Sequence, residues 1–187
     1  MYQKELPKVS AFIAVYQEVD FIREAIDSVL IQDYPNLEII IGDDGSTDGT
    51  QEILKDYQQK YSTLIKLILS KENTGITANC NRIFKECTGK YIAFFAGDDI
   101  WLPGKIRTQV DYMENHFECS ICYHNLEVFD NDSGSKIGNF NNIYNPPRTG
   151  KADVLIRHGC FNGAIANMVR RSNCPDYGFD QRVPIAS

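Results

Sequence analysis

Residues 37–50 read Leu37-Glu-Ile-Ile-Ile-Gly-Asp-Asp-Gly-Ser-Thr-Asp-Gly-Thr50, an apolar run that ends in a turn-rich acidic loop. The apolar half, 37–41, is typical of a buried strand, and Thr47 or Asp48 can cap a helix that follows the loop. Residues 90–96 have the same design, because Lys90-Tyr-Ile-Ala-Phe-Phe-Ala96 runs directly into Gly97-Asp98-Asp99. The sequence thus predicts two strands that each end in a carboxylate-bearing loop.

Strands and helices alternate around these two loops. The apolar pattern predicts further strands at 9–15 and 64–69, and amphipathic helices at 21–30, from about residue 50, and at 74–87. This alternation indicates right-handed crossovers and an α/β fold, with a mostly parallel central sheet and helices on both faces. Because parallel strands place their carboxyl ends at one edge, we expect both acidic loops to open there, where such sheets bind ligands.

The pattern is less regular after residue 101. We expect a helix at 102–116, a strand at 119–129, a short helix at 152–158 and a strand at 165–170. Residues 130–150 are rich in Asn, Gly and Pro, which predicts either a long functional or mobile loop or a hairpin.

The composition excludes several classes of protein. The chain has 187 residues, with 19 Lys and Arg against 25 Asp and Glu, so its formal net charge is −6. This length fits one domain, and the acidic balance argues against a nucleic-acid partner. The six cysteines are expected to be reduced core thiols, because Cys119-x-x-Cys122 lacks the second close pair of a zinc knuckle. The longest wholly apolar stretch, 91–96, is too short to cross a bilayer, so we expect a cytoplasmic protein.

Familiar ligand-binding loops are absent from the sequence. No Gly-x-Gly-x-x-Gly follows the strand at 9–15, and no Gly-Lys pair is followed by the Ser or Thr of a phosphate loop. The run from Asp44 to Lys55 begins like a calcium loop, but its twelfth position is a lysine where a glutamate is needed.

Asp98 and Asp99 are the remaining candidates for chemistry. Adjacent carboxylates repel each other unless a cation or a donor intervenes, and hard dications such as Mg²⁺ and Mn²⁺ take oxygen ligands. Such a pair alone is more typical of a solvated turn, but the strand before it and the tryptophan after it favour a site. Trp101 fits core packing better than stacking on a sugar, and Lys105 is either a surface charge or a phosphate contact. The pair Arg170-Arg171 is more typical of a solvated surface than of an acceptor or membrane contact.

Taken in order, the motifs resemble those of the family 2 glycosyltransferases, which have the GT-A fold with a Rossmann-like N-terminal half. The resemblance covers nearly all of the chain and implies one domain over 1–187. Its nucleotide-binding half would span about 8–115, and an incomplete acceptor-side half about 116–187. The motifs are Val9-Ser10 to Tyr16-Gln17-Glu18, Ala25-Ile-Asp-Ser-Val-Leu30 with Gln32, Asp43-Asp-Gly-Ser-Thr-Asp-Gly-Thr50, Asn73-x-Gly75 with Asn81, Gly89-Lys-Tyr-Ile92, and Asp98-Asp-x-Trp-x-Pro-x-Lys105.

The resemblance implies a role for each of these positions. The nucleotide-binding residues would be Tyr16 and Glu18 at the base and ribose, Asp44 as acceptor of a base N–H, Asp43 as support of that loop, Asn73, Gly75 and Asn81 along the cleft, and Asp98 at the ribose hydroxyls. Asp99, together with Asp98, would bind Mn²⁺ or Mg²⁺ that bridges the donor diphosphate.

The resemblance also implies an activity. The chain is expected to be an inverting, metal-dependent glycosyltransferase that moves a sugar from a nucleotide-diphosphate sugar, UDP-linked by preference. The acceptor would be a saccharide or lipid-linked saccharide in polysaccharide or glycolipid synthesis, with peripheral contact at the inner membrane face. The catalytic base of the family follows a stretch that resembles residues 178–185, so we expect it just beyond Ser187. The alternative is a nucleotide-sugar-binding module without catalysis.

Three positions depart from the family pattern. Gln17 stands where Asn is more frequent, Cys80 where a basic residue is common, and Ala14 where a hydroxyl or another small residue occurs. The change at Cys80 removes one expected phosphate partner.

Overall fold

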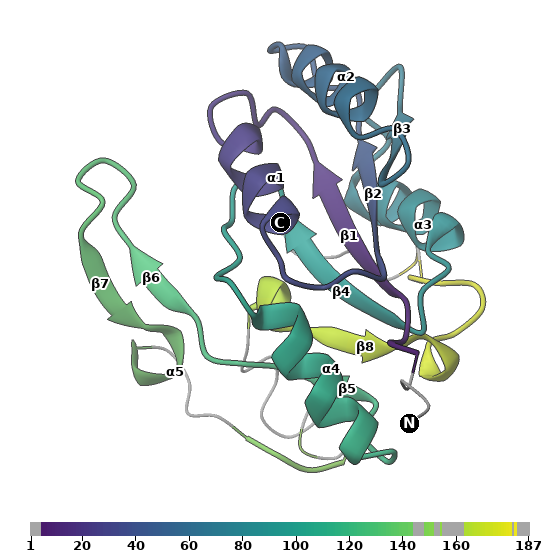
Figure 1. Ribbon diagram of the computed structural model, residues 1–187. Helices are drawn as coiled ribbons and strands as arrows, with labels where there is room; N and C mark the ends of the chain where they lie inside the picture. The colour runs from purple at the N-terminus through teal and green to yellow at the C-terminus, as the bar shows by residue number, and fades with distance from the viewer. Residues whose placement is uncertain (1–4, 144–147, 152–153, 155–162, 181, 183–187) are drawn as a thin grey trace.

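The central sheet has six strands in the order β3-β2-β1-β4-β8-β5 (Figure 1). The computed structural model describes residues 5–143, 148–151, 154, 163–180 and 182. The strands of this sheet are β1 (Val9–Val15), β2 (Leu37–Asp43), β3 (Ile65–Leu69), β4 (Tyr91–Ala96), β5 (Ile121–Cys122) and β8 (Met168–Arg170). The first four in this order pair in parallel, and β8 pairs antiparallel with both β4 and β5. The predicted α/β fold with a mostly parallel sheet is therefore confirmed.

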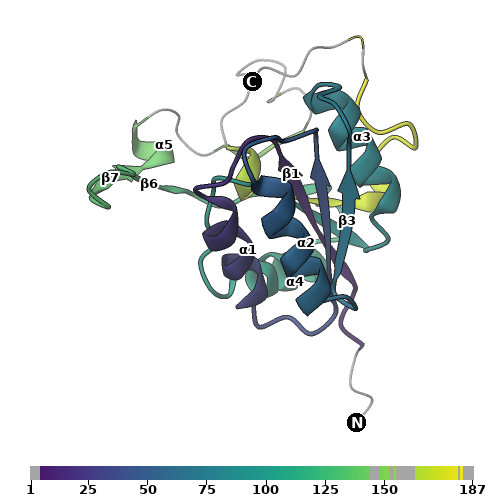
Figure 2. The ribbon, with the colours of Figure 1, turned by 90° about the horizontal axis from the view of Figure 1, so that it is seen from above.

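Helices cover both faces of this sheet, as Figure 2 shows. One apolar cluster joins alternate residues of the strands to three helices, α1 (Ile22–Leu30), α2 (Thr50–Lys60) and α4 (Lys105–Asn115). The other residues of the strands pack against α3 (Ile76–Glu86) in a second cluster. The strands are apolar on both sides for this reason, as a sheet between two helical layers requires.

The helix α3 lies unusually close to β2. A Cβ atom at Gly42 would lie 2.4 Å from Cγ1 of Ile83, so only a glycine allows this approach. The Asn79 side chain uses the same space, since its Nδ2 donates to the Gly42 carbonyl oxygen at 2.8 Å. This contact fixes the start of α3 beside the end of β2.

A buried polar network ties the segment after the Asp98–Asp99 turn to α1. The Ser28 hydroxyl accepts the Trp101 backbone N–H at 3.0 Å, and the Gln32 amide donates to the Leu102 carbonyl at 3.0 Å. Both side chains are buried, and Trp101 itself is 1% exposed, with its ring centroid 4.8 Å from that of Phe95. The interpretation of Trp101 as core packing is confirmed.

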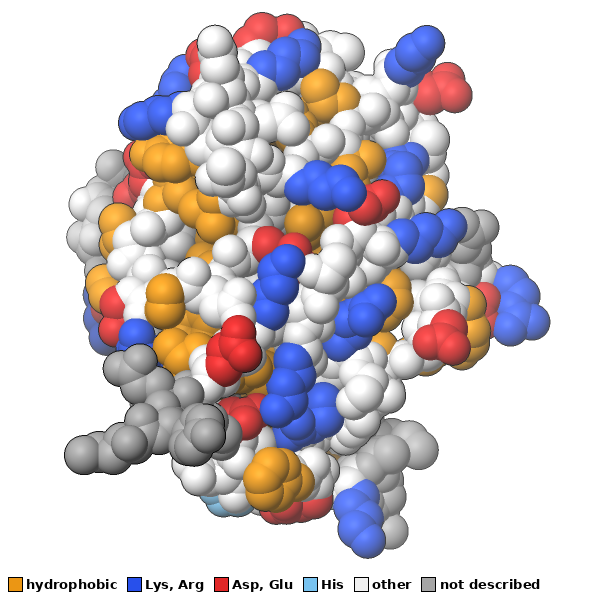
Figure 3. Space-filling view, turned by 45° about the vertical axis from the view of Figure 1, so that its right-hand side comes forward, with side chains coloured by type: hydrophobic (Ala, Val, Ile, Leu, Met, Phe, Trp, Pro, Cys, Tyr) orange, Lys and Arg blue, Asp and Glu red, His pale blue; other side chains and the backbone are white. Residues whose placement is uncertain are grey.

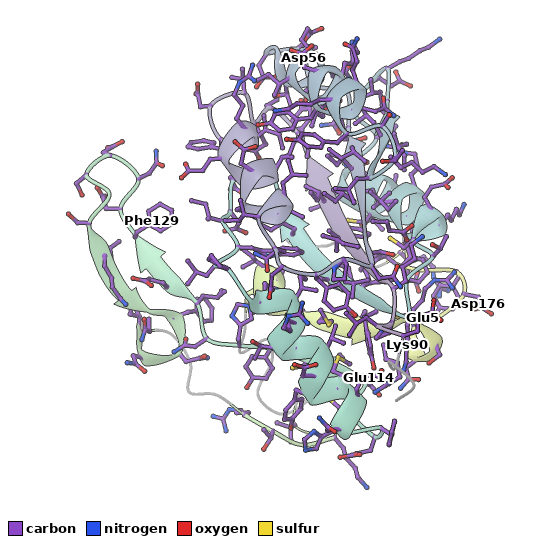
Figure 4. All side chains as sticks on the ribbon, in the orientation of Figure 1. Glu5, Asp56, Lys90, Glu114, Phe129 and Asp176 are labelled. Carbon is purple, nitrogen blue, oxygen red and sulfur yellow. The ribbon has the colours of Figure 1, made fainter. Side chains whose placement is uncertain are left out.

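The region after α4 differs most from the prediction. The expected strand at 119–129 is two short strands, β5 and β6 (Glu127–Phe129), with an irregular segment between them. The Asn-rich segment contains a hairpin, in which β7 (Lys136–Asn139) pairs with β6 and is followed by α5 (Phe140–Ile143). This hairpin extends away from the central sheet, and Phe129 at its tip side is labelled in Figure 4.

The remaining described elements are two short 3₁₀ helices that flank β8. They are η1 (Ala164–Ala166) and η2 (Arg171–Asn173), so the predicted strand at 165–170 is shorter than expected. The short helix predicted at 152–158 lies almost entirely outside the described residues. In the part of the chain that the structure describes, no helix is long and apolar enough to span a membrane.

Two cations for which the sequence analysis offered a surface position are buried. Arg170 donates from Nη1 to the Tyr91 hydroxyl at 3.0 Å and from Nη2 to the Met113 carbonyl at 2.9 Å, so only Arg171 of that pair is exposed. Lys105 is 8% exposed, and its Nζ donates to Gln109 Oε1 at 2.7 Å and lies 4.4 Å from the Trp101 ring centroid. The interpretation of Lys105 as a surface charge is therefore wrong.

The burial of Lys105 predicts a pH dependence of stability. Burial lowers the pKa of Lys105 from 10.5 to about 7. An unfolded lysine keeps its proton up to about pH 10.5, so the unfolded chain binds more protons between pH 7 and that value. The contribution of Lys105 to the free energy of unfolding should therefore rise with pH through this window, by an amount on the order of a few kcal/mol.

Lys105→Met should remove most of this rise, measured by urea unfolding at pH 7 and pH 9.5. Lys85→Met, at an exposed position of α3, is the control and should keep the slope of the wild type. An unchanged slope in Lys105→Met would show that the side chain does not titrate in this way.

Candidate functional site

The loops after β1, β2 and β4 meet at the carboxyl edge of the sheet. The Gln17 backbone N–H donates to Ser46 Oγ at 2.8 Å, and the Gln17 side-chain oxygen accepts the Thr47 N–H at 2.9 Å. The Glu18 N–H donates to Thr50 Oγ1 at 2.9 Å. These bonds join the first two loops into one wall of the candidate site.

Gln17 holds a strained backbone at this junction. Its φ of 59° is the one positive value among the described residues that are not glycine. Asn adopts this left-handed region more readily than most residues, which gives a physical reason for the Asn that the family more often has here. Gln17 supports the strained conformation through its bonds to the loop after β2.

Asp43 is the internal support of the loop after β2. Its side chain is fully buried, and its Oδ1 accepts the backbone N–H groups of Gly45 at 3.1 Å and Ser46 at 3.0 Å. The Gln51 amide donates to the same oxygen at 2.6 Å. This geometry suits the supporting part that the sequence predicted for Asp43.

Asp44 joins the same loop to the start of α3. Its Oδ1 accepts the Thr74 N–H at 3.1 Å, the Thr74 hydroxyl at 2.8 Å and Nη2 of Arg82 at 2.7 Å, while its Oδ2 accepts the Gly75 N–H at 2.8 Å. Burial acts to raise the pKa of Asp44, but the bonds from Thr74, Arg82 and Gly75 outweigh it, and the pKa lies below its usual value. Asp44 is therefore ionised at neutral pH and already holds four donors.

The sequence prediction missed Arg82. It attended to Cys80, where the family often has a basic residue, and Cys80 is indeed buried among apolar side chains. The guanidinium two residues later supplies the cation instead, since Arg82 donates both to Asp44 and to the Thr74 hydroxyl at 2.8 Å. The sequence did contain a signal for this role, because Arg82 is a basic residue two positions after Cys80 on the same helix.

The carboxylates of the loops after β1 and β4 act on one another. Burial raises the pKa of Glu18 to about 7, with smaller contributions from Asp98, Asp48 and Asp99. Burial and the neighbouring Asp98 likewise raise the pKa of Asp99 to about 6. The raised pKa values of Glu18 and Asp99 come in part from repulsion between nearby carboxylates, which agrees with the prediction that these acidic residues gather at one edge. Tyr16, beside them on the loop after β1, is 45% exposed.

Asp98 and Asp99 fit a divalent cation by their chemistry. Carboxylate oxygens are the ligands that Mg²⁺ and Mn²⁺ prefer, and an ion between them would relieve the repulsion that raises the pKa of Asp99. Asp98 is exposed and Asp99 is half-buried. Among the described residues, no three His, Cys, Asp or Glu side chains are grouped as a metal cluster. Two carboxylates suit a site that substrate phosphates complete.

The other predicted residues lie along α3 and the turn before it. Asn73 is exposed, and its Oδ1 accepts the Gly75 N–H at 2.9 Å. Asn81 lies farther along the helix, where its side-chain amide bonds the backbone of Phe179. Asn73 and Gly75 thus lie beside Asp44, whereas Asn81 faces the C-terminal segment.

The sheet order and the carboxylates at its edge define a GT-A fold of the α/β class. The chain belongs to glycosyl transferase family 2, whose family model matches residues 10–177. This confirms the resemblance that the motifs carried.

Two relatives come from Bacillus subtilis (strain 168). The putative glycosyltransferase EpsE is 40% identical over 66% of this chain and 45% of its own length. The putative teichuronic acid biosynthesis glycosyltransferase TuaG is 37% identical over 57% of this chain and 42% of its own length. The chain thus spans less than half the length of these relatives.

Two solved structures share the fold. S. aureus TarS 1-349 in complex with UDP-GlcNAc has a TM-score of 0.65 and 18% identity, covering 88% of this chain and 46% of that one. The mannosyltransferase PcManGT from Pyrobaculum calidifontis, in complex with GDP-Man and Mn²⁺, has a TM-score of 0.59 and 23% identity, covering 66% and 36%. At this identity the likeness concerns the fold.

The contacts of Asp43 predict a large effect on stability. Asp43→Ala leaves three donors without their acceptor in a buried loop, which should lower the free energy of unfolding by about 2–4 kcal/mol. Asp56→Ala is the matched control, because Asp56 projects from α2 (Figure 4) and should change stability by less than about 0.5 kcal/mol. Urea unfolding measures both, and equal values for the two variants would contradict the role of Asp43.

Proposed function

We propose that this chain is the donor-binding domain of an inverting glycosyltransferase that uses a nucleotide-diphosphate sugar, by preference a UDP-linked one. The observation that carries the proposal is the meeting of Glu18, the Asp44 loop and the Asp98–Asp99 turn at one edge of the sheet. Such edges hold the ligands of open α/β sheets. The UDP-GlcNAc of TarS and the GDP-Man of PcManGT are donors of this chemical class.

The nucleotide would lie between the loop after β1 and the start of α3. Tyr16 and Glu18 would border the base and ribose, with Asn73 and Gly75 on the opposite side and Asp98 near the ribose hydroxyls. Asp44 is the proposed acceptor of the base N–H. Because its two oxygens already hold four donors, a base N–H would replace one of them. Arg82 is the proposed one, because its guanidinium would keep Thr74 and Asn79 as partners.

Asp98 and Asp99 would hold Mn²⁺ or Mg²⁺ beside the donor diphosphate. A bound dication there supplies Lewis-acid stabilisation of the charge that develops on the departing nucleoside diphosphate, worth several kcal/mol. Support comes from the raised pKa of Asp99 and from the Mn²⁺ in PcManGT. The residues of this chain contribute by fixing the turn, since Ser28 and Gln32 hold the backbone that follows it.

The acceptor side of the proposal rests on the family. Inversion requires in-line attack by an acceptor hydroxyl with a general base within hydrogen-bond reach. We assign this base to none of the described residues. The division into a nucleotide-binding half at about 8–115 and an acceptor-side half at about 116–187 is part of the proposal. A saccharide or lipid-linked saccharide acceptor, reached at the inner membrane face, is also part of it, and the relation to TuaG supports polysaccharide synthesis.

Isothermal calorimetry with UDP, with and without Mn²⁺, tests the donor site. We expect binding that Mn²⁺ strengthens, and we expect Asp99→Asn to weaken the Mn²⁺-dependent affinity by about tenfold or more, since it removes a charged ligand. Asp56→Asn on the exposed face of α2 should bind like the wild type.

Two outcomes would count against the proposal in different ways. No metal-dependent nucleotide binding at millimolar UDP would reject the donor site itself. Binding without sugar transfer to any saccharide acceptor would favour a nucleotide-sugar-binding module in place of an enzyme.

A further inference from the structure

The segment after β8 runs along α3 toward the edge that carries the candidate site. It leaves the sheet where Arg170 pairs with Tyr91, the first residue of β4, so it starts at the amino edge. The helix α3 runs in the opposite direction, because it follows β3 and therefore begins at the carboxyl edge. In Figures 1 and 2 the described part of this segment lies beside α3. By Phe179 it has reached the middle of the helix.

One side chain of α3 holds this segment by two reciprocal hydrogen bonds. Nδ2 of Asn81 donates to the Phe179 carbonyl oxygen at 2.9 Å, and Oδ1 of Asn81 accepts the Phe179 N–H at 2.7 Å. A side-chain amide that pairs with both backbone groups of one residue mimics a step of a β-ladder. This pair uses one N–H and one lone pair of the Asn81 amide and fixes the orientation of the side chain toward the C-terminal segment.

The neighbouring residues are shaped for this contact. Gly178 has a φ of +74°, and a Cβ atom there would lie 2.5 Å from Asn81 Oδ1, so only glycine permits both the turn and the approach. The Phe179 ring lies 6.3 Å from Phe12, 6.3 Å from Phe84 and 6.2 Å from Phe94, between centroids. The segment is thus anchored to the sheet as well as to the helix.

The same helix also holds the donor side of the site. The turn that begins α3 gives the N–H groups of Thr74 and Gly75 to Asp44, and Asn81 lies within two helical turns of Gly75. The nucleotide loop and the C-terminal segment are therefore bound to opposite ends of one short rigid stretch of helix.

We infer that Asn81 is a positioning residue of the acceptor side and not a ligand of the donor. It anchors the turn at 178–180, which belongs to the proposed acceptor-side half, to the helix whose first turn holds the Asp44 loop. The inference rests on the proposed function for its catalytic consequence, while the anchor itself follows from the contacts of Asn81. It replaces the earlier expectation that Asn81 lines the nucleotide.

Asn81→Ala separates the two assignments through three measurements. Hydrogen exchange of the peptide that covers 175–182 should become at least tenfold faster, because the only described bonds of that backbone to α3 are lost. The affinity for UDP with Mn²⁺ should stay within about twofold of the wild type. In sugar transfer, kcat per UDP-binding site should fall by tenfold or more while the donor KM stays unchanged; a general loss of stability would lower the number of UDP-binding sites together with the total rate and leave kcat per site unchanged.

Gly178→Ala should produce the same three changes, because it disrupts the Asn81 contact from the C-terminal segment. It is the variant to measure if Asn81→Ala does not fold. Asp56→Ala is the control, since Asp56 is an exposed residue of α2 and should leave all three measurements unchanged. Unchanged exchange, or unchanged kcat, would overturn the inference. A tenfold loss of UDP affinity with normal exchange would also overturn it and make Asn81 a donor ligand.

A failure of the proposed function has a different signature. In that case the wild-type chain itself would show no metal-dependent UDP binding. The exchange measurement on Asn81→Ala and Gly178→Ala would still report whether the anchor exists.

Discussion

The Asp44 carboxylate is the interaction on which the candidate site depends. It is nearly fully buried, and it joins the end of β2 to the first turn of α3 through bonds to Thr74, Gly75 and Arg82. Charge-assisted bonds of this kind are stronger than neutral ones, and a buried carboxylate left without them would be costly. The position of α3, and with it the C-terminal segment bound to α3, therefore depends on this aspartate together with the Asn79 bond to Gly42.

The N-terminal part of the fold was predictable because its signals are local. Each strand from β1 to β4 is a short apolar run, each helix repeats its apolar residues every three or four positions, and parallel pairing then dictates where the acidic loops lie. The position of Asp98 and Asp99 followed from this topology alone. Ser28 and Gln32 appeared as motif residues without a function, and their role became visible only as contacts to residues about 70 positions away.

The later part was less predictable because long-range contacts decide it. The predicted strand at 119–129 is interrupted beyond Cys122, whose carbonyl accepts the Gln109 amide of α4. Arg170 looks like a surface cation in sequence, yet its buried guanidinium bonds Tyr91, 79 positions away. Lys105 bonds Gln109 on its own helix, but its burial comes from packing against Trp101. Arg82 escaped notice because its partner Asp44 is 38 positions away. Pairings of this kind leave no periodic trace in the sequence.

The net charge of −6 is unevenly distributed. Acidic side chains meet at the carboxyl edge, where Asp98, Asp48 and Asp99 act on Glu18, while Lys and Arg side chains recur across the face shown in Figure 3.

The loop after β2, at the same edge, also has a consequence for chemical ageing. Asp-Gly sequences isomerise when the glycine nitrogen attacks the aspartate side chain, and Asp44-Gly45 is such a sequence. Here the Gly45 N–H is bound to Asp43, and the Asp44 carboxylate is held by donors from α3. The hydrogen bonds that shape the loop therefore also protect its backbone against this covalent damage.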